Sequence, residues 1–324
     1  MIRIKRGLDL PISGAPEQKI GDCQAVRSVA LLGRDYVGMQ PTMAVKAGDR
    51  VKLGQVLFTD KKYPAINYTA PGTGIVAAIH RGLQRRLLAV VIELDGAQPD
   101  AAQADTHVVF NKYSDKQVTA LTRATLVKDL LSSGMWTALR TRPFSKVPNP
   151  EATPHSLFVN AMDPAPIIAA QLQDFVVGVN LLARLPRYRL HLCVAPALAV
   201  QLKDQAFNGN VLIQQFKGPH PAGLSGTHMH FLDPAGPQKE HWSINYQDVI
   251  AVAHLFRTGS LHVERILALA GPQVDKPRLV RSRIGANLNE LMETELRPHE
   301  SRVISGSVLA GDRVAGVEAF LGQV

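Results

Sequence analysis

The chain has few cysteines and no long apolar run. Its two cysteines, Cys23 and Cys193, stand far apart among 324 residues, which is typical of a reducing compartment. Two thiols are also fewer than an iron–sulfur cluster usually takes. The apolar segment 167–185 is interrupted by Gln, Asp and Asn, so it predicts a core-packed helix, not a membrane span of ~18 residues or more. The N-terminus lacks the apolar region of a secretory signal. We therefore expect a cytoplasmic protein.

Aromatic residues are also scarce, at 6% of the chain. The net charge is +9, from 36 Lys and Arg against 27 Asp and Glu, but the basic residues are dispersed and no nucleic-acid-binding motif is present. These features exclude nucleic acid as the expected partner. A solvated surface with a positive bias is the simplest interpretation of the charge, and docking on an anionic membrane face is the next.

Phosphate-binding and hydrolase motifs are absent as well. The sequence has no Walker motif, no GxGxxG and no Ser/His/Asp order, so NTPase and hydrolase functions have no support. Three histidines near one another, His220, His228 and His230, do not make a metal motif, because no suitably spaced carboxylate or cysteine accompanies them. We expect no metal site, and we assign His220 and His228 to contact with a ligand or partner.

The chain is organised around the segment 132–166. A helical pattern precedes it, with a capping box between Ser114 and Gln117 and Gly134 as the closing residue. The apolar stripe of this helix is Ala120, Ala124, Val127 and Leu131. A buried strand at 156–160 follows the loop, and a turn at Asp163–Pro164 leads into another helix. This order is typical of a nucleotide-binding α/β domain.

The expected nucleotide site has too few glycines. Closely spaced glycines let backbone N–H groups surround a phosphate, and only Gly134 stands in this loop. Further along, strands at 188–195 and 210–216 flank a helix at 196–207, which predicts a parallel sheet. The segment 218–230 then predicts a tight loop at the carboxyl end of that sheet, where α/β proteins place ligands.

The regions before and after the α/β segment contain mainly short strands. Turns at 45–49 and 70–74 separate alternating strands, a pattern that resembles the barrel-sandwich fold of biotinyl and lipoyl carrier domains. We reject Lys61 or Lys62 as a carrier lysine, because the connection that follows is too long for a tight hairpin. After a helix at 245–256 and a strand at 265–271, strands at 278–284 and 302–309 enclose a helix at 287–293. That order resembles a β-grasp domain of the soluble-ligand-binding type.

Several longer motifs carry a family resemblance. The runs GLDLPISG at 7–14, VALLGRDYVGMQPTMAV at 29–45 and TALRTRPFSKVP at 137–148 resemble the family of A subunits of Na⁺-translocating NADH:quinone oxidoreductases. That family is related to the C subunit of Rnf complexes and the FMN-bearing subunit of complex I. Its members continue beyond Val324, so we expect a C-terminally truncated chain.

The resemblance implies an α/β and α+β multidomain fold. We expect an N-terminal segment with a barrel-sandwich domain at 1–100, a Rossmann-like α/β domain at 101–257 and a β-grasp domain at 258–324. The flavin-binding relatives carry a loop of the form GGAGFPTxxK. Gly134, Thr137 and Arg140 stand for its Gly, Thr and Lys, whereas Ser132 and Ser133 replace the leading glycines, and the acidic motif that follows is reduced to Met162–Pro164.

The resemblance also implies a function. It describes a peripheral subunit on the cytoplasmic side of the bacterial inner membrane, in a six-subunit complex that moves electrons from NADH to ubiquinone and exports Na⁺. FMN, FAD, riboflavin and iron centres are expected in the partner subunits, and no catalysis is expected from the isolated chain. The alternative is an FMN-binding electron-transfer subunit of the complex I or Rnf type.

The degenerate loop is the candidate site. We expect it to bind no redox cofactor, because the two serines and the Trp136 ring would fill the space of the flavin. Met135 and Trp136 could cover a quinone headgroup, with Arg140, His220 and His228 donating to its carbonyls. The alternative is that these residues only close an emptied pocket.

Overall fold

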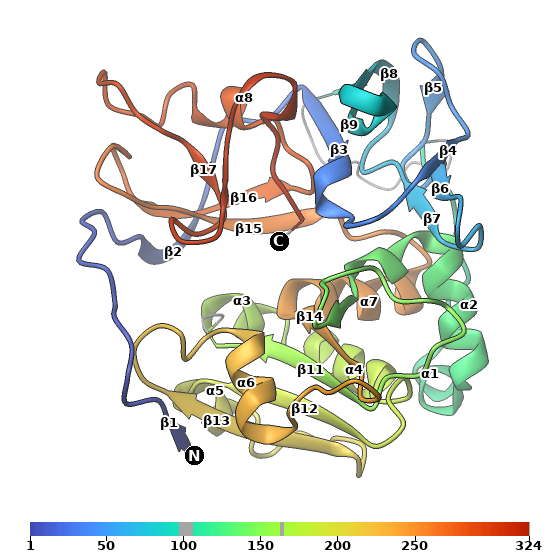
Figure 1. Ribbon diagram of the computed structural model, residues 1–324, viewed down its shortest axis with the longest axis vertical. Helices are drawn as coiled ribbons and strands as arrows, with labels where there is room; N and C mark the ends of the chain where they lie inside the picture. Colours follow the sequence, from blue (N-terminus) through green and yellow to red (C-terminus); the bar gives the residue numbers. More distant parts are fainter. Residues whose placement is uncertain (97–105, 163–164, 324) are drawn as a thin grey trace. The chain divides into compact units, whose positions relative to one another are not determined.

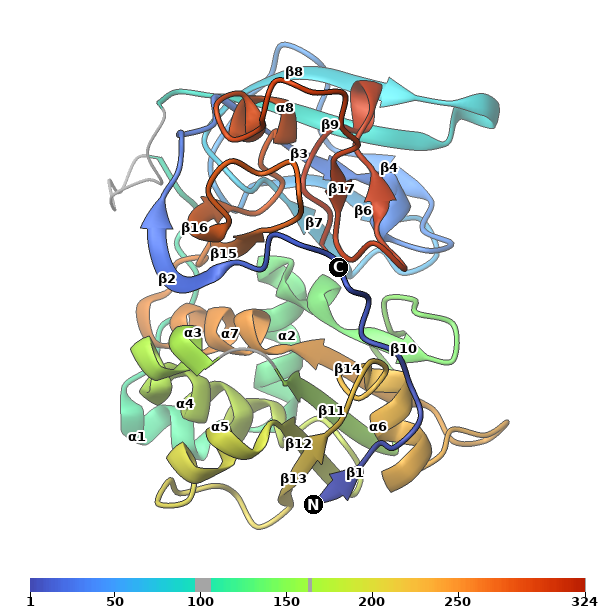
Figure 2. The same ribbon diagram turned by 90° about the vertical axis from the view of Figure 1, so that its left-hand side faces the viewer.

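The computed structural model describes residues 1–96, 106–162 and 165–323 (Figures 1 and 2). The chain forms two compact units, one of Met1–Pro11 with Phe110–His262 and the other of Ile12–Val109 with Val263–Val324. The expected domain boundary at 100 and 101 and the turn at Asp163–Pro164 lie outside the described residues. Among the residues described, no helix combines the length and the apolar character needed to cross a membrane.

The first unit is built on a six-stranded sheet in the order β1-β13-β12-β11-β14-β10. Its strands are β1 (Ile2–Arg3), β10 (Arg140–Arg142), β11 (Ser156–Ala161), β12 (Arg189–Val194), β13 (Val211–Lys217) and β14 (His241–Asn245). Neighbouring strands are parallel except β10, which runs antiparallel to β14. The parallel pairing of β12 with β13 confirms the expected sheet.

Helices cover both faces of this sheet. They are α1 (Asp115–Ala120), α2 (Arg123–Ser133), α3 (Ala165–Ala170), α4 (Leu172–Leu182), α5 (Pro196–Gln201), α6 (Ser225–Leu232) and α7 (Tyr246–Thr258), with the short 3-10 helix η3 (Met135–Ala138). Figure 2 shows α3, α4, α5 and α7 on one side and α6 on the other. On the α6 side, Met229 packs with Phe158, Cys193 and Phe216 in one apolar cluster.

The helix expected before the central segment is two helices. Its capping box is confirmed, because the Ser114 N–H donates to the Gln117 side chain at 2.9 Å. The helix ends at Ala120, however, and Thr122 caps a new one by accepting from the Thr125 N–H at 3.2 Å. In the helix that starts at this second cap, the buried residues are Leu126, Asp129, Leu130 and Ser133. The expected stripe of Ala120, Ala124, Val127 and Leu131 was therefore wrong, since both alanines are exposed.

Three other expected elements differ in extent. The helix over 167–185 is divided into α3 and α4 at Gln171, and the helix over 196–207 ends at Gln201. The expected loop over 218–230 contains α6 from Ser225 onward. Polar and glycine-rich composition hid this helix, because it has only a narrow buried face.

The second unit consists mainly of strands. They form the sheets β3-β9-β8-β5, β4-β6-β7, β15-β16-β2 and β17-β18. The strands are β2 (Glu17–Asp22), β3 (Ser28–Leu32), β4 (Pro41–Met43), β5 (Arg50–Val51), β6 (Val56–Asp60), β7 (Asn67–Thr69), β8 (Gly74–Arg81), β9 (Leu87–Leu94), β15 (Glu264–Leu269), β16 (Arg278–Arg283), β17 (Ile304–Ser305) and β18 (Asp312–Arg313). The short helices are η1 (Gly33–Asp35), η2 (Leu83–Arg85), α8 (Leu288–Met292) and η4 (Gly316–Glu318). The strand expected over 302–309 is thus only two residues long.

The second unit combines the segment after Pro11 with the C-terminal part of the chain. Strand β2 pairs in parallel with β16, and Phe320 packs with Ala30, Leu32 and Ala89 in one apolar cluster. Lys61 and Lys62 are exposed on the connection 61–66 between β6 and β7. This connection is longer than the two-residue turn that presents a carrier lysine, in agreement with our rejection of that role.

Candidate functional site

The predicted site segment begins where α2 ends. Gly134 closes that helix in the left-handed conformation, with φ 81°, a backbone geometry that favours glycine. The next residues form η3 and enter β10. The Thr137 hydroxyl donates to the Gly134 carbonyl at 2.8 Å, so the segment is held by its own side chains.

Ser132 and Ser133 lie in the last turn of α2. Their hydroxyls donate to the Asp129 carbonyl at 3.1 and 2.7 Å. At this end of a helix the unpaired backbone groups are carbonyls, and the helix dipole is negative. The place that resembles the phosphate loop therefore offers acceptors to an incoming group, not the N–H donors that a phosphate needs.

Trp136 fills the interior of this segment. Its side chain is fully buried, and the indole N–H donates to the Pro148 carbonyl at 2.9 Å. The ring meets Trp242 of β14 edge to face, with centroids 5.3 Å apart. Met135 is buried beside it. A flat ligand can enter here only if Trp136 moves.

Arg140 is also buried and is turned toward its own chain. Its guanidinium donates to the carbonyls of Thr137 and Leu139, the latter at 3.0 Å. These bonds hold the backbone in place where η3 leads into β10. They occupy guanidinium N–H groups that we expected to donate to a quinone.

The two loop histidines lie in different surroundings. His228 in α6 is fully buried; its Nε2 meets the Ala222 carbonyl at 2.8 Å, and burial lowers its pKa. His220 is exposed, and its backbone N–H donates to Asp9 at 2.8 Å. His230 is exposed on α6. Of the two candidates, only His220 presents its ring to solvent without rearrangement.

The structure does not bring all the predicted residues together. Trp136 contacts β14 and Arg140 belongs to β10, whereas His228 packs on Phe216 of β13, with ring centroids 4.3 Å apart. Strands β10 and β13 are four strand spacings apart in the sheet, or roughly 19 Å at about 4.8 Å per spacing.

The two groups also lie on opposite faces of the sheet. Successive side chains of a strand alternate between faces, so Trp242, which contacts Trp136, points away from the face of His241. His241 contacts Phe158 at 5.6 Å between ring centroids, and Phe158 shares an apolar cluster with Phe216. The buried histidine of α6 is on that side. A single quinone ring cannot touch both groups at once.

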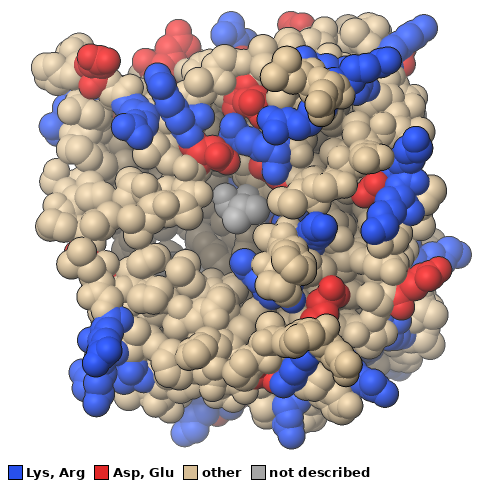
Figure 3. Space-filling model, in the orientation of Figure 1, with Lys and Arg blue, Asp and Glu red and all other residues tan. Residues whose placement is uncertain are grey.

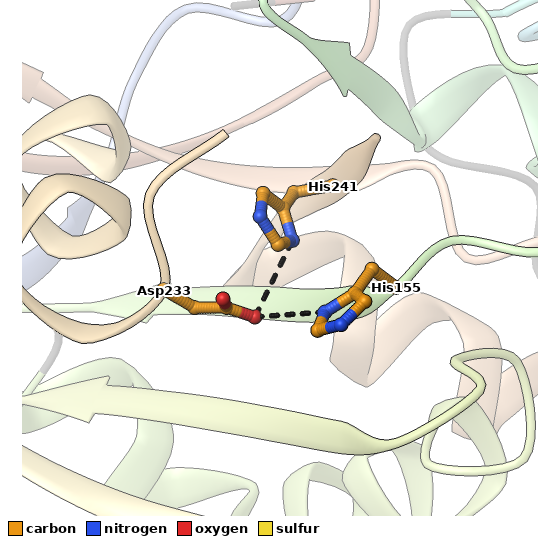
Figure 4. A group of neighbouring side chains, drawn as sticks. All are labelled: His155, Asp233 and His241. Atoms are coloured by element: carbon orange, nitrogen blue, oxygen red, sulfur yellow. Dashed lines mark hydrogen bonds and ion pairs between the residues drawn. The ribbon is translucent and has the colours of Figure 1, made fainter. Parts of the chain in front are cut away.

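Sequence reasoning missed a cluster of His155, Asp233 and His241 (Figure 4). One possible ligand atom from each residue lies within 4.8 Å of the others. His155 precedes β11 and His241 begins β14, so both stand at the amino-terminal edge of the parallel sheet, where Asp233 arrives from the end of α6. His155 and Asp233 are 78 residues apart, and the only signal in the sequence was a histidine at the start of two strands.

Asp233 is the negative centre of this cluster. It accepts from the Ser156 hydroxyl at 2.6 Å and faces His155 Nδ1 at 3.0 Å. Its other oxygen forms an ion pair with Lys239. Burial acts to raise the pKa of Asp233, but the hydrogen bonds from Lys239 and Ser156 outweigh it and bring the pKa down to about 2. The carboxylate is therefore charged at neutral pH.

His241 lies deeper than the other two. It is fully buried, and neither ring nitrogen makes a hydrogen bond of normal geometry with the described residues. Its Nδ1 lies 3.8 Å from Asp233. Burial lowers its pKa against the opposing effect of that carboxylate and of the Pro234 carbonyl. His191 lies nearby, and burial lowers its pKa to about 4. Both rings are neutral at pH 7 and keep a nitrogen lone pair available.

Comparisons with known protein families match three parts of the chain. The family descriptions that match are "NqrA N-terminal barrel-sandwich hybrid domain" over residues 2–95, "NqrA second alpha/beta domain" over 121–261 and "NQRA C-terminal domain" over 266–316. The chain is therefore a mixed α/β multidomain protein with an N-terminal barrel-sandwich domain and a second α/β domain.

Individual relatives are similar along the whole chain. The A subunit of the Na⁺-translocating NADH-quinone reductase of Pseudomonas aeruginosa is 56% identical over 100% of this chain and 71% of its own length. The proteins of the same name from Cellvibrio japonicus and Pasteurella multocida are each 51% identical over the full chain, covering 71% and 72% of their own lengths. The chain belongs to the family of A subunits of the Na⁺-translocating NADH-quinone reductase.

Proposed function

We propose that this chain acts as the A subunit of a Na⁺-translocating NADH:quinone reductase. The observation that carries the proposal is the 56% identity with such a protein over the whole chain. In this role the chain is a peripheral part of a membrane complex on the cytoplasmic side, and it contributes to quinone reduction coupled to Na⁺ export only when the other subunits are present.

Subunit exchange tests this role. The chain would replace its counterpart in a complex expressed with the remaining subunits of a relative, and Na⁺-stimulated NADH:quinone reductase activity would be measured in membranes. We expect activity that disappears when the chain is omitted. Assembly of the other subunits without this chain, at full activity, would contradict the proposal.

We further propose finer assignments for two of the domains. The parallel order β13-β12-β11-β14, with strands added on both sides of β11 and helices on both faces, supports a Rossmann-like domain with boundaries near 101–257. The sheet β15-β16-β2 with α8 beside it supports a β-grasp domain at 258–324, although β2 comes from the segment 1–100.

The chain, in this proposal, binds no redox cofactor of its own. The residues at the degenerate flavin loop do not fit FMN, because the end of α2 presents carbonyls where a phosphate needs N–H donors. Trp136 fills the adjacent space. Flavins and iron centres then belong to partner subunits, and the alternative of an FMN-binding electron-transfer subunit is not favoured.

Flavin release gives a direct test. The purified chain is expected to be colourless and to release no FMN on heat denaturation. The double variant Ser132→Gly, Ser133→Gly is expected to remain flavin-free when incubated with FMN, because Trp136 still occupies the space. Stoichiometric FMN in the supernatant of either protein would restore the alternative function.

Ubiquinone is the ligand we propose for the segment of Trp136 and Arg140, and partner contact is the role we propose for His220 and His228. The separation of these two pairs across the sheet supports two roles in place of one. Binding of a headgroup beside Trp136 requires the ring to leave its contact with Trp242. We expect ¹H–¹⁵N shifts of residues 134–140 on titration with a short-tail ubiquinone, and shifts confined to other surfaces would contradict this assignment.

A further inference from the structure

Three candidate metal ligands meet at the edge of the sheet opposite to the one where α/β proteins usually bind their ligands. They are His155, Asp233 and His241, at the amino-terminal ends of β11 and β14 and at the end of α6. Figure 4 shows both imidazole rings directed toward the same carboxylate oxygen. The cluster lies on the face of the sheet opposite to Trp136.

The spacing of the ligand atoms suits a small tetrahedral cation. His155 Nδ1 lies 3.0 Å and His241 Nδ1 lies 3.8 Å from the same Asp233 oxygen. Zinc binds nitrogen and oxygen ligands at about 2.1 Å, which places tetrahedral ligands about 3.4 Å from one another. These two distances bracket that value, and the two imidazole nitrogens lie within 4.8 Å of each other, so side-chain movements would be needed to complete the geometry.

The unsatisfied His241 ring is an independent observation that points to a ligand. This side chain has no exposed surface, and neither ring nitrogen makes a hydrogen bond of normal geometry with the described residues, although the Pro234 carbonyl lies near enough to raise its pKa. Buried polar atoms are nearly always paired, because an unpaired one loses its hydrogen bonds to water without replacement. A metal bound to Nδ1 would satisfy the nitrogen that faces Asp233.

We propose that His155, Asp233 and His241 form a binding site for a divalent transition-metal ion of the zinc type. Two imidazoles and one carboxylate select such an ion, whereas Na⁺, Ca²⁺ and Mg²⁺ prefer sites made of oxygen. The fourth position is left for water, since His155 and Lys239 each keep about a third of their side chain exposed and give the site access to solvent.

Lys239 is the main competitor for the same carboxylate. It pairs with the second oxygen of Asp233, and the Ser156 hydroxyl donates to the first. Metal binding to the first oxygen leaves Lys239 on the second. The ammonium group lowers the affinity of the site for a cation. Replacing Lys239 should therefore strengthen metal binding, whereas replacing a ligand should weaken it.

Zinc binding to the purified full chain tests the proposal. We expect one Zn²⁺ per chain by equilibrium dialysis against a weak chelator, and a visible absorption spectrum typical of four-coordinate cobalt when Co²⁺ is used as the probe. The apparent melting temperature should rise by about 5–10 °C at a hundredfold excess of Zn²⁺ over its Kd.

Variants separate this site from an ordinary ion-pair cluster. His155→Ala removes a partly exposed ligand and should weaken Zn²⁺ binding by about a hundredfold or more, since even outer partners of a metal are worth 10–100-fold. Lys239→Met should strengthen it by about tenfold, because a nearby positive charge is lost. His230→Gln, an exposed histidine on α6 outside the cluster, is the matched control and should leave binding unchanged.

The outcomes that would overturn the proposal are equally specific. Absence of stoichiometric Zn²⁺ in both the parent chain and Lys239→Met would show that the cluster is an ion pair only. Equal loss of binding in His155→Ala and His230→Gln would place the metal elsewhere.

Discussion

At the scale of single residues, Trp136 shows how the site segment is stabilised. Its ring is fully buried, its indole N–H is paired with the Pro148 carbonyl, and it packs edge to face on Trp242. A large aromatic residue in such surroundings contributes mainly through the apolar area that it removes from water. The segment therefore depends on this residue for its stability, whatever it binds.

Trp136→Ala is expected to lower the free energy of unfolding by about 3–5 kcal/mol, the range for removing a large buried aromatic side chain. Urea denaturation followed by circular dichroism measures this loss. Phe144→Ala is the matched control, because Phe144 lies in the turn after β10 with 70% of its surface exposed, and it should cost less than about 0.5 kcal/mol. Similar losses in both variants would contradict the burial of Trp136.

His228 should make the stability of the protein sensitive to acid. Burial lowers its pKa in the folded state, so the unfolded chain takes up a proton below pH ~6.5 while the folded chain resists it. Above that pH, the neutral His228 ring makes its full contribution to the free energy of unfolding. That contribution is lost as the pH falls toward the folded pKa, by up to about 1.4 kcal/mol per pH unit for one group.

The corresponding variant is His228→Gln, which keeps a donor for the Ala222 carbonyl that His228 now meets. Its unfolding free energy should fall less steeply between pH 7 and pH 5 than that of the parent chain. His191, with a pKa of about 4, leaves a residual slope in both proteins. The exposed His230→Gln should follow the parent curve, and equal slopes for all three proteins would show that His228 is not held neutral.

At the scale of elements, local signals in the sequence identified the strands at the centre of the α/β sheet and two helix boundaries. The capping box of Ser114 with Gln117 and the C-cap at Gly134 depend only on residues nearby in the sequence. The structure confirms both. The second cap at Thr122 was missed because the apolar pattern of this segment is also compatible with one continuous helix. The hydrogen bond from the Thr125 N–H to Thr122 is what starts a new helix there. The pairing of residues 17–22 with β16 has no local signal at all.

The histidine cluster shows the same limit for a site. His155, Asp233 and His241 come together only because β11 and β14 are neighbours in the sheet and α6 ends above them. Spacing along the chain carries none of that information. By contrast, Trp136 and Arg140 belong to one continuous segment, so the sequence was sufficient to identify them. It did not predict that both side chains are buried.

The contact between α4 and α7 depends on a glycine. A Cβ at Gly178 would stand 2.1 Å from the Val249 carbonyl oxygen of α7, which is closer than atoms can approach. Gly178→Ala should therefore cost about 1–3 kcal/mol by forcing the helices apart. Gly226→Ala in α6 is the matched control: nothing lies within 4 Å of its Cβ, so alanine should stabilise the helix by up to about 1 kcal/mol. Thermal denaturation of both variants measures the difference in sign.

At the scale of the whole molecule, the net charge of +9 governs how the chain meets its partners. Figure 3 shows Lys and Arg side chains spread over the visible face with Asp and Glu among them, without one continuous basic patch. A charge distributed in this way attracts anionic lipid or acidic protein surfaces over many weak contacts. Such an attraction acts within a Debye length of about 8 Å at physiological ionic strength and about 3 Å in 1 M salt.

The attachment of this chain to membranes that contain the remaining subunits should therefore weaken as salt rises. We expect the fraction released into the supernatant to increase steadily from low salt to 1 M KCl, measured by sedimentation and immunoblotting. Sucrose at the same osmolality is the control and should release none, because it leaves the charges unscreened. If retention is the same at every salt concentration, apolar burial holds the chain, and the exposed charges serve only to keep it hydrated.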